Sequence, residues 1–324
     1  MTARARADLA CRLARDAGLA RVGIAPAGPI ARSAYVRAWL DGGHAGEMAY
    51  LHRRAELRED PRQLLEGAQS IIVVADLYRQ AEPEPPPNDE PVPRGRIARY
   101  AWGRDYHKIL RKKLHRLTDA LHEAIDEPFD ARVCVDTAPL IEREAAAAAG
   151  VGWIGKNTMV IDPALGSFFF LGEIITTLEL APSPPMTDHC GSCTRCLDAC
   201  PTDALTAPYR MDATRCISYL TIEHRSEIPA PLQPLMDDWV FGCDVCQDVC
   251  PYNRQPSVAA DPAYQPRDRK GLGPRPPLAE LLDLDDQAYR ARLAGSAVKR
   301  ATPLMLQRNA RIVRANLARA RTSP

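Results

Sequence analysis

The chain has 324 residues, of which 46% are hydrophobic and 26% charged, and its formal net charge is +1. These values are typical of a globular protein with one large or two moderate domains, and they exclude a strongly basic or acidic polyelectrolyte. The first 20 residues lack the apolar run of a secretory signal, and no segment approaches the ~18 apolar residues of a membrane span. We therefore expect a soluble, cytoplasmic protein that has no membrane partner.

Hydrophobic periodicity and turn residues predict an α/β layered domain over residues 1–180. Helices are expected over residues 5–19, 35–58 with an interruption at Gly42 and Gly43, 106–125 and 139–149, and strands over residues 21–26, 70–77, 132–135, 159–161 and 167–180. The strand at 70–77 is largely apolar, as expected of a strand that is buried on both faces. Residues 81–95 contain six prolines and are expected to form an extended loop.

Eight of the ten cysteines form two runs. The first run is Cys190, Cys193, Cys196 and Cys200, followed by Pro201, and the second is Cys216, Cys243, Cys246 and Cys250, followed by Pro251. The first run has the C-x2-C-x2-C-x3-C-P spacing of bacterial ferredoxins, and the second is the same run with its first cysteine displaced upstream. The spacing predicts two [4Fe–4S] clusters and, with them, electron transfer.

In two-cluster ferredoxins the fourth cysteine of each run ligates the other cluster. We therefore assign the first cluster to Cys190, Cys193, Cys196 and Cys250, and the second to Cys216, Cys243, Cys246 and Cys200. Structural zinc is the main alternative, but zinc sites usually take two cysteine pairs. A disulfide framework fits less well, because this is not a small secreted domain. The remaining two cysteines, Cys11 and Cys134, lie in apolar patterns and are interpreted as buried thiols.

Two motifs lack the context that their usual function requires. Residues 150–157 resemble both a dinucleotide-binding and a phosphate-binding loop, but an alanine-rich helix precedes them where a strand is required. We expect a glycine-rich turn whose backbone can approach a flat or anionic ligand. Asp105 and His107 begin like a cobalt-binding D-x-H-x-x-G motif, but residue 110 is leucine. The pattern favours the start of a surface helix.

Asp136 follows the predicted strand at 132–135 and precedes the predicted helix at 139–149. A carboxylate at this edge of a sheet is either in a catalytic position or the N-cap of the next helix, a role that Thr137 could share. The pattern alone favours capping. Arg58 is similarly open to two interpretations, a solvated helix end or an anion contact.

Several stretches closely resemble the epoxyqueuosine reductase family, cobalamin-dependent iron–sulfur enzymes of tRNA queuosine synthesis. They are residues 101–107, 135–137, 150–157, 190–202, 215–223, 242–251, 295–300 and 308–309. The resemblance extends over nearly the whole chain. It implies an α/β (α+β) cobalamin-binding domain similar to that of reductive dehalogenases over residues 1–180. A double [4Fe–4S] ferredoxin-type domain over residues 181–255 and a linker with a basic helical segment over residues 256–324 would follow. We expect a short form, without the C-terminal helical repeats of longer members.

The resemblance also implies a reaction and a set of site residues. The expected reaction is the reduction of epoxyqueuosine to queuosine at the wobble position of tRNA by a monomer that receives electrons from an external donor. Asp136 matches the proposed proton donor of the family, and this outweighs the capping interpretation. The positions that match or adjoin cobalamin contacts are Arg58, Ala98, Asp136, Lys156, Asn157 and Ser218. Burial against the corrin is expected to raise the pKa of Asp136 toward the working pH.

A tRNA substrate requires a positive surface. Lys299, Arg300, Arg308, Arg311 and Arg314 lie in a C-terminal stretch without acidic residues, and the helix at 106–125 has a second basic face. A solvated helix face explains such residues equally well. Two other functions remain open. The first, a corrinoid reductase of a small molecule such as a dehalogenase, is disfavoured by the basic tail. The second, a ferredoxin-type electron-transfer subunit, does not account for the α/β domain.

Overall fold

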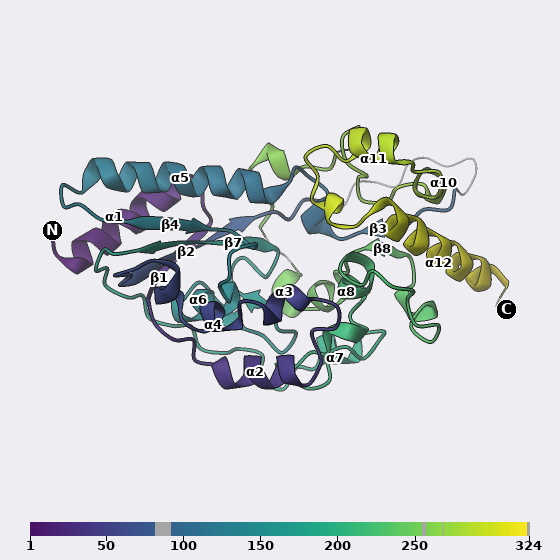
Figure 1. The fold of residues 1–324 in the computed structure, drawn as a ribbon, viewed down its shortest axis with the longest axis horizontal. Coiled ribbons are helices and arrows are strands. Elements are labelled where there is room, and N and C mark those ends of the chain that lie inside the picture. Colours follow the sequence, from purple (N-terminus) through teal and green to yellow (C-terminus); the bar gives the residue numbers. More distant parts are fainter. Residues whose placement is uncertain (82–91, 255–256, 268, 323–324) are drawn as a thin grey trace.

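The N-terminal part of the chain forms a four-stranded sheet (Figure 1). The computed structural model describes residues 1–81, 92–254, 257–267 and 269–322. The strand order is β1 (Arg21–Pro26), β2 (Ser70–Leu77), β7 (Phe169–Thr176) and β4 (Ala131–Cys134), and all neighbours are antiparallel. The predicted strands at 21–26 and 70–77 are confirmed. The proline-rich loop predicted at 81–95 falls largely outside the described residues.

Helices cover both faces of this sheet (Figure 1). On one face lie α1 (Ala3–Asp16) and α5 (Tyr106–Ala124), and on the other lies α6 (Glu142–Ala148). Because side chains alternate along a strand, Ile72 and Val74 enter the core beneath α1 and α5, while Ile71 and Val73 enter the core beneath α6. The prediction that this strand is buried on both faces is confirmed.

The predicted interruption of the helical segment at 35–58 by Gly42 and Gly43 is confirmed, and the segment is divided into three helices. These are α2 (Ser33–Asp41), α3 (Ala49–His52) and α4 (Ala55–Glu59). The break begins at Gly42 and continues past Gly46, whose φ is +55°. A Cβ at Gly46 would lie 2.2 Å from the Tyr219 hydroxyl oxygen, so this turn must carry glycine to let the cysteine-rich part approach.

The glycine-rich segment at 150–157 packs against the protein's own backbone. It leads into a short hairpin of β5 (Trp153–Ile154) and β6 (Val160–Ile161), of which β5 was not predicted. A Cβ at Gly150 would lie 2.2 Å from the Pro184 carbonyl oxygen, and one at Gly152 would lie 2.4 Å from that of Ile161. These two glycines make room for neighbouring chain, and the expected approach of this turn to a ligand stays a prediction.

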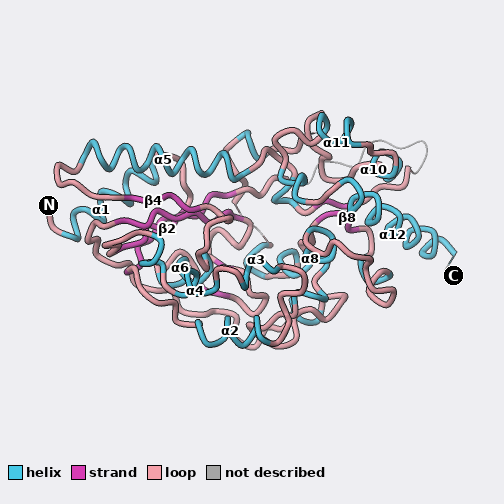
Figure 2. The backbone as a smooth tube through the Cα atoms, in the orientation of Figure 1, coloured by secondary structure: helices cyan, strands magenta, loops and turns pink. Residues whose placement is uncertain are grey.

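The cysteine-rich and C-terminal parts are mostly loops and short helices (Figure 2). The helices are α7 (Arg195–Asp198), α8 (Ile217–Ile222), α9 (Val245–Asp248), α10 (Leu278–Leu282), α11 (Asp286–Arg292) and α12 (Pro303–Thr322). Short 3-10 helices cover Pro61–Leu64, Arg99–Ala101, Ala213–Arg215, Pro234–Met236, Pro251–Asn253, Pro262–Tyr264 and Ala297–Arg300. None of the helices in the described ranges is long and apolar enough to cross a membrane.

Two packing contacts link the three predicted parts of the chain. Strand β3 (Arg96–Ile97) leaves the N-terminal part and pairs in parallel with β8 (Trp239–Phe241). Ile97 thereby joins a core that also contains Leu306 of α12, while Tyr264 joins the core of the N-terminal sheet. The boundaries at 180 and 255 stay an interpretation of the sequence, and the cores extend across them.

Arg308 is not part of a basic surface. It is buried in α12, where its guanidinium donates to the carbonyl oxygens of Leu220 at 2.7 Å, His224 at 2.8 Å and Ser226. It thus holds α12 against α8 and the turn that follows it. The expectation that Arg308 contributes to tRNA binding is corrected, whereas Arg311 and Arg314 are exposed.

Candidate active site

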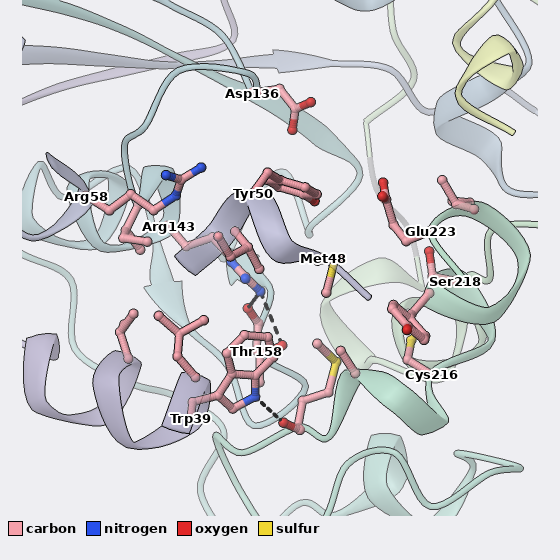
Figure 3. A pocket seen from close by; sticks show the side chains of 18 of the residues that line it. Trp39, Met48, Tyr50, Arg58, Asp136, Arg143, Thr158, Cys216, Ser218 and Glu223 are labelled. Atoms are coloured by element: carbon pink, nitrogen blue, oxygen red, sulfur yellow. Dashed lines mark hydrogen bonds between the residues drawn. The ribbon is translucent and has the colours of Figure 1, made fainter. Parts of the chain in front are cut away.

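A cavity of about 1160 Å³ lies where the sheet domain meets the cysteine-rich part (Figure 3). Its volume exceeds the ~300–1,000 Å³ of ordinary small-molecule sites. Figure 3 shows Arg58 on one wall, Cys216 and Ser218 on the opposite wall, and Asp136 at a third side. The floor is closed where the Trp39 indole N–H donates to the Met211 carbonyl oxygen at 2.6 Å. The cavity therefore joins residues that are far apart in the sequence.

Three of the six predicted cofactor-binding residues line this cavity, namely Arg58, Asp136 and Ser218. Arg58 is largely buried, and burial lowers the pKa of its guanidinium from the ordinary value. Ala98 is described but does not line the cavity: it is 1% exposed, and Gly242 packs closely against its Cβ.

Lys156 and Asn157 are also outside the cavity lining and instead contact the cysteine loops. The Lys156 ammonium donates to the carbonyl oxygens of Gly191 at 2.6 Å and Cys193 at 3.0 Å. The Asn157 amide donates to the carbonyl oxygen of Cys246 at 3.2 Å. In this structure the two residues support both cysteine runs from the side of the sheet domain.

Asp136 is held in an unusual backbone conformation beside the cavity. Its φ is +51°, and its N–H donates to the Glu142 carboxylate. Helix α6 begins at Glu142, and the residue before it, Ile141, makes no side-chain cap. The capping interpretation of Asp136 is therefore wrong. Its side chain is 52% exposed and points into the cavity (Figure 3).

The Asp136 carboxylate is paired with His107. His107 Nε2 lies 2.9 Å from Asp136 Oδ2, and His107 Nδ1 lies 2.7 Å from Asp105 Oδ1. Burial lowers the pKa of His107, but the hydrogen bonds and charges of the two carboxylates outweigh burial and raise it to about 9. Burial likewise raises the pKa of Asp136, but His107 outweighs it and holds that pKa below the ordinary value. The expected rise of the Asp136 pKa concerns its burial against the corrin and stays a prediction.

Two more carboxyl groups lie beneath the Asp136 loop. Glu173, on β7, is 0% exposed, and burial raises its pKa well above the ordinary value. Burial and the charge of Asp136 raise the pKa of Glu142 to about 8. Because adjacent buried carboxylates repel each other, this pair retains protons that free glutamates would have lost at neutral pH.

The eight cysteines of the two runs are free thiols. Burial raises the pKa of Cys250, and the nearby thiols of Cys190 and Cys193 add to this shift. Cys196 likewise has Cys190 and Cys250 as charged neighbours. Cys250 therefore lies beside the first run, although it belongs to the second run in sequence.

The other four thiols form the second group. Burial raises the pKa of Cys243, with Cys216 and Cys200 as its thiol neighbours. Burial also raises the pKa of Cys246, whose thiol neighbours are Cys243, Cys216, Cys200 and, from the first group, Cys196. No three His, Cys, Asp or Glu side chains in the described ranges are spaced to bind one metal ion. Thiolates around a cubane stand farther apart than thiolates around one ion, because each binds a different iron. Cys216 also lines the cavity.

Two family models match the chain. The model described as "Epoxyqueuosine reductase QueG" matches residues 58–137, and the "4Fe-4S double cluster binding domain" matches residues 189–253. The chain is 40% identical to the epoxyqueuosine reductase of Pseudomonas aeruginosa over 288 residues, which are 89% of this chain and 79% of that protein. The chain belongs to the epoxyqueuosine reductase family. It is an oxidoreductase, and it carries a double [4Fe–4S] cluster-binding domain.

Other epoxyqueuosine reductases agree with this assignment. The protein of Gloeobacter violaceus is 43% identical over 92% of both chains. A crystal structure of an epoxyqueuosine reductase with an epoxyqueuosine-modified tRNA-Tyr stem loop has a TM-score of 0.88 at 32% identity, covering 95% of this chain and 80% of that one. The Bacillus subtilis structure, described as having its catalytic aspartate loop swung out of the active site, has a TM-score of 0.86 at 31% identity, covering 97% and 82%.

The structure adds cavity residues that the sequence interpretation did not assign to the epoxyqueuosine reductase site. They include His107, Tyr50, Arg143, Glu223 and Arg300. His107 lies in the resembling stretch 101–107 but was interpreted as the start of a helix, and Asp105 does cap α5 as that interpretation required. The proximity of His107 to Asp136 depends on the fold, since 29 positions separate them in sequence.

Proposed function

We propose that this epoxyqueuosine reductase family member reduces epoxyqueuosine to queuosine at the wobble position of tRNA, with two [4Fe–4S] clusters and cobalamin. The observation that carries the proposal is that Cys216 and Asp136 line one cavity. Cys216 is a predicted cluster ligand, and Asp136 is the predicted proton donor. A source of electrons and a source of protons would therefore face the same bound molecule.

The two thiol groups support the crossed ligand sets. The neighbours of Cys250 come from the first run, and Cys200 is a neighbour of Cys243 from the second. Crossed ligation places two cubanes close together, because each run then contacts both clusters. Electrons would pass from the first cluster to the second, whose ligand Cys216 is at the cavity wall.

The cavity fits a large, flat cofactor such as cobalamin. Its lining combines aromatic and apolar side chains, including Trp39, Met48 and Tyr50, with polar groups at Arg58 and Ser218. We propose that Arg58 and Ser218 contact the cofactor, and that Ala98, Lys156 and Asn157 act indirectly by supporting the walls and the cysteine loops. Bound cobalamin supplies a cobalt centre that bonds to carbon and couples one-electron donors to a two-electron reduction.

Asp136 is the proposed proton donor to the epoxide oxygen. Its carboxyl group lies at a side of the cavity between the wall of Arg58 and the wall that carries the cluster ligand (Figure 3). Positioned acids of this kind typically accelerate a reaction by ~10²–10⁴-fold.

The proposed tRNA surface lies beside the cavity. Lys299 is exposed, and Arg300 lines the cavity, where it forms a bidentate ion pair with Glu223 at 2.8 Å. The exposed Arg311 and Arg314 continue this surface along α12. Such residues would bind phosphates without reading the sequence.

An external donor would supply the electrons in the cell, because the proposed reaction consumes two electrons for each queuosine formed. Cysteine-ligated clusters are compatible with the reducing cytoplasm, which is the proposed location. The proposed form in solution is a monomer.

The test of this function is anaerobic reconstitution of the protein with iron, sulfide and cobalamin, followed by incubation with epoxyqueuosine-containing tRNA and a low-potential reductant. We expect nucleoside mass analysis to show the loss of one oxygen atom and the appearance of queuosine. Protein that loads both cofactors but leaves epoxyqueuosine unchanged would contradict the proposal. Turnover of a halogenated small molecule under those conditions would favour the dehalogenase alternative, and absence of a bound corrinoid spectrum would favour the electron-transfer alternative.

A further inference from the structure

We propose that His107 is a positioning residue that stores the proton which Asp136 delivers to the substrate oxygen, and that Asp105 holds the imidazole in place. This inference rests on the proposed function of the cavity. It follows from the hydrogen-bonded series Asp105–His107–Asp136, whose last member faces the cavity.

The orientation of the imidazole ring is determined on three sides. Asp105 is itself fixed, because its side chain accepts the N–H of residue 107 as the N-cap of α5. The ring of Tyr106 stacks on that of His107, with centroids 4.1 Å apart, and on that of Phe170 of β7, also at 4.1 Å. The imidazole is thus tied to the sheet and cannot turn its Nε2 away from Asp136 without losing these contacts.

The geometry favours an imidazole that carries two protons. Each ring nitrogen lies within hydrogen-bonding distance of a carboxylate oxygen, at 2.7 Å and 2.9 Å. A carboxylate can only accept, so a neutral ring would leave one nitrogen lone pair facing a negative oxygen. The doubly protonated ring donates to both Asp105 and Asp136.

The other charged groups near Asp105, His107 and Asp136 do not move the proton away from the His107 imidazole. Glu142 contacts the backbone of Asp136 and adds a nearby carboxyl group, while the Arg300 guanidinium acts electrostatically on Asp136 from the opposite wall. Tyr106 and Tyr100 are partly buried, and burial raises both of their pKa values, so the phenols stay neutral. The raised pKa of His107, about 9, and the lowered pKa of Asp136 place the proton on the imidazole at neutral pH.

The proposed reaction requires this store of protons. Both C–O bonds of the epoxide break, a C=C bond forms, and the oxygen leaves as water, which consumes two electrons from the external donor and two protons. Asp136 as a carboxylate has no proton to give. The first proton moves from Nε2 of His107 through Asp136 to the oxygen as the first C–O bond breaks. The imidazole then takes a proton from solvent and supplies the second in the same way.

The test is the pH dependence of the single-turnover rate constant for His107→Gln and Asp105→Asn, measured with the loaded enzyme and epoxyqueuosine-tRNA. In the wild type we expect the rate to hold through neutral pH and to fall above about pH 9, where the imidazolium is lost. In His107→Gln the proton must reside on Asp136 itself. The ratio of the wild-type single-turnover rate constant to that of His107→Gln should therefore grow about tenfold per pH unit across the neutral range. The KM for tRNA should be unchanged.

Asp105→Asn keeps a side chain that can cap α5 but removes the negative charge beside Nδ1. We expect the alkaline limit of its rate profile to move to lower pH. An NMR titration of the His107 ring, without substrate, should show its pKa falling in Asp105→Asn and in Asp136→Asn. His115→Gln, an exposed position on the same helix, should change neither measurement.

A His107→Gln variant with the wild-type rate and pH profile would overturn the inference. If that variant fails to fold or to hold clusters, an unchanged alkaline limit in Asp105→Asn would overturn it equally. A His107 pKa at or below its ordinary value of 6.5 in the wild type would do the same. Wild-type protein without any turnover of epoxyqueuosine would instead contradict the proposed function, and the NMR titration would still decide the protonation of His107.

Discussion

The side-chain amide of Asn157 donates a hydrogen bond to the main-chain carbonyl oxygen of Cys246, at a distance of 3.2 Å. The preceding residue, Lys156, donates to two carbonyl oxygens next to the first cysteine run. One short turn of the sheet domain thus holds both predicted cluster loops. Through this turn, the stability of the clusters depends on the sheet domain, which also forms the cavity wall opposite Cys216.

Lys156→Met should therefore weaken the first cluster. The substitution removes two hydrogen bonds from a charged donor to the loop around Cys193. We expect iron loss to a chelator to be about threefold to tenfold faster, measured by the decay of the cluster absorbance. Lys112→Met, at an exposed position of α5, is the control and should lose iron at the wild-type rate. Equal rates in both variants would show that Lys156 has no role in cluster retention.

Serine substitutions can test the crossed ligand sets. We expect Cys250→Ser to perturb the same electron paramagnetic resonance signal as Cys193→Ser, and Cys200→Ser to perturb the same signal as Cys216→Ser. The reason is that Cys250 lies beside the first run and Cys200 beside the second. Cys11→Ser, outside both runs, should leave both signals intact. If Cys200→Ser instead matched Cys193→Ser, each run would hold its own cluster.

Asp136→Asn should abolish most turnover without disturbing the fold. Asparagine tolerates the positive φ of +51° and preserves the size of the side chain. Removing the acid should lower the single-turnover rate constant by ~10²–10⁴-fold. Iron content and the spectrum of bound cobalamin should match the wild type. A variant that turned over at the wild-type rate would remove Asp136 from the mechanism.

Glu173→Gln should stabilise the protein above acidic pH. The folded-state pKa of Glu173 is raised above the ordinary 4.5, so the unfolded chain loses this proton at a pH where the folded protein keeps it. The stability of the wild type then falls as pH rises above ~4.5, by at most about 1.4 kcal/mol per pH unit for one group, until the folded state also ionises. Glutamine has no proton to lose.

The measurement is the Tm of the loaded protein between pH 4 and pH 8. The two proteins should differ least at pH 4, and the Tm of Glu173→Gln should exceed that of the wild type increasingly toward pH 8. Glu179→Gln, at an exposed position beyond the same strand, is the control and should follow the wild type. A constant difference across this range would mean that Glu173 does not change its protonation on unfolding.

Lys299→Glu should weaken tRNA binding. Lys299 is exposed beside Arg300, which lines the cavity. We expect KM for tRNA to rise several-fold at low salt and the difference from the wild type to shrink at high salt, because phosphate contacts release counterions. Arg12→Glu, on α1 at the other end of the molecule, is the matched control (Figure 1). An unchanged KM in Lys299→Glu would count against this surface.

Several elements were predictable because their signals are local. The strands at 21–26 and 70–77 follow from short β-branched runs between turn residues, and α5 follows from its helical period. The cysteine spacing by itself indicated two clusters, since ligand geometry around a cubane depends on only a few residues. The interruption of residues 35–58 was predictable from Gly42 and Gly43, whereas its extension past Gly46 was not, because it depends on how closely Tyr219 approaches Gly46.

The sequence by itself determined the family and the two cysteine runs, because each is carried by short motifs with a specific spacing, and the family resemblance singled out Asp136 as the predicted proton donor. Only the tertiary structure decided what surrounds Asp136. The imidazole of His107 comes from a different element, and its two carboxylate neighbours are the reason why we propose that the histidine, and not the aspartate, holds the proton. A pKa depends on all the charges and the burial within a few ångströms, and residues at that distance are brought together by folding and not by sequence order.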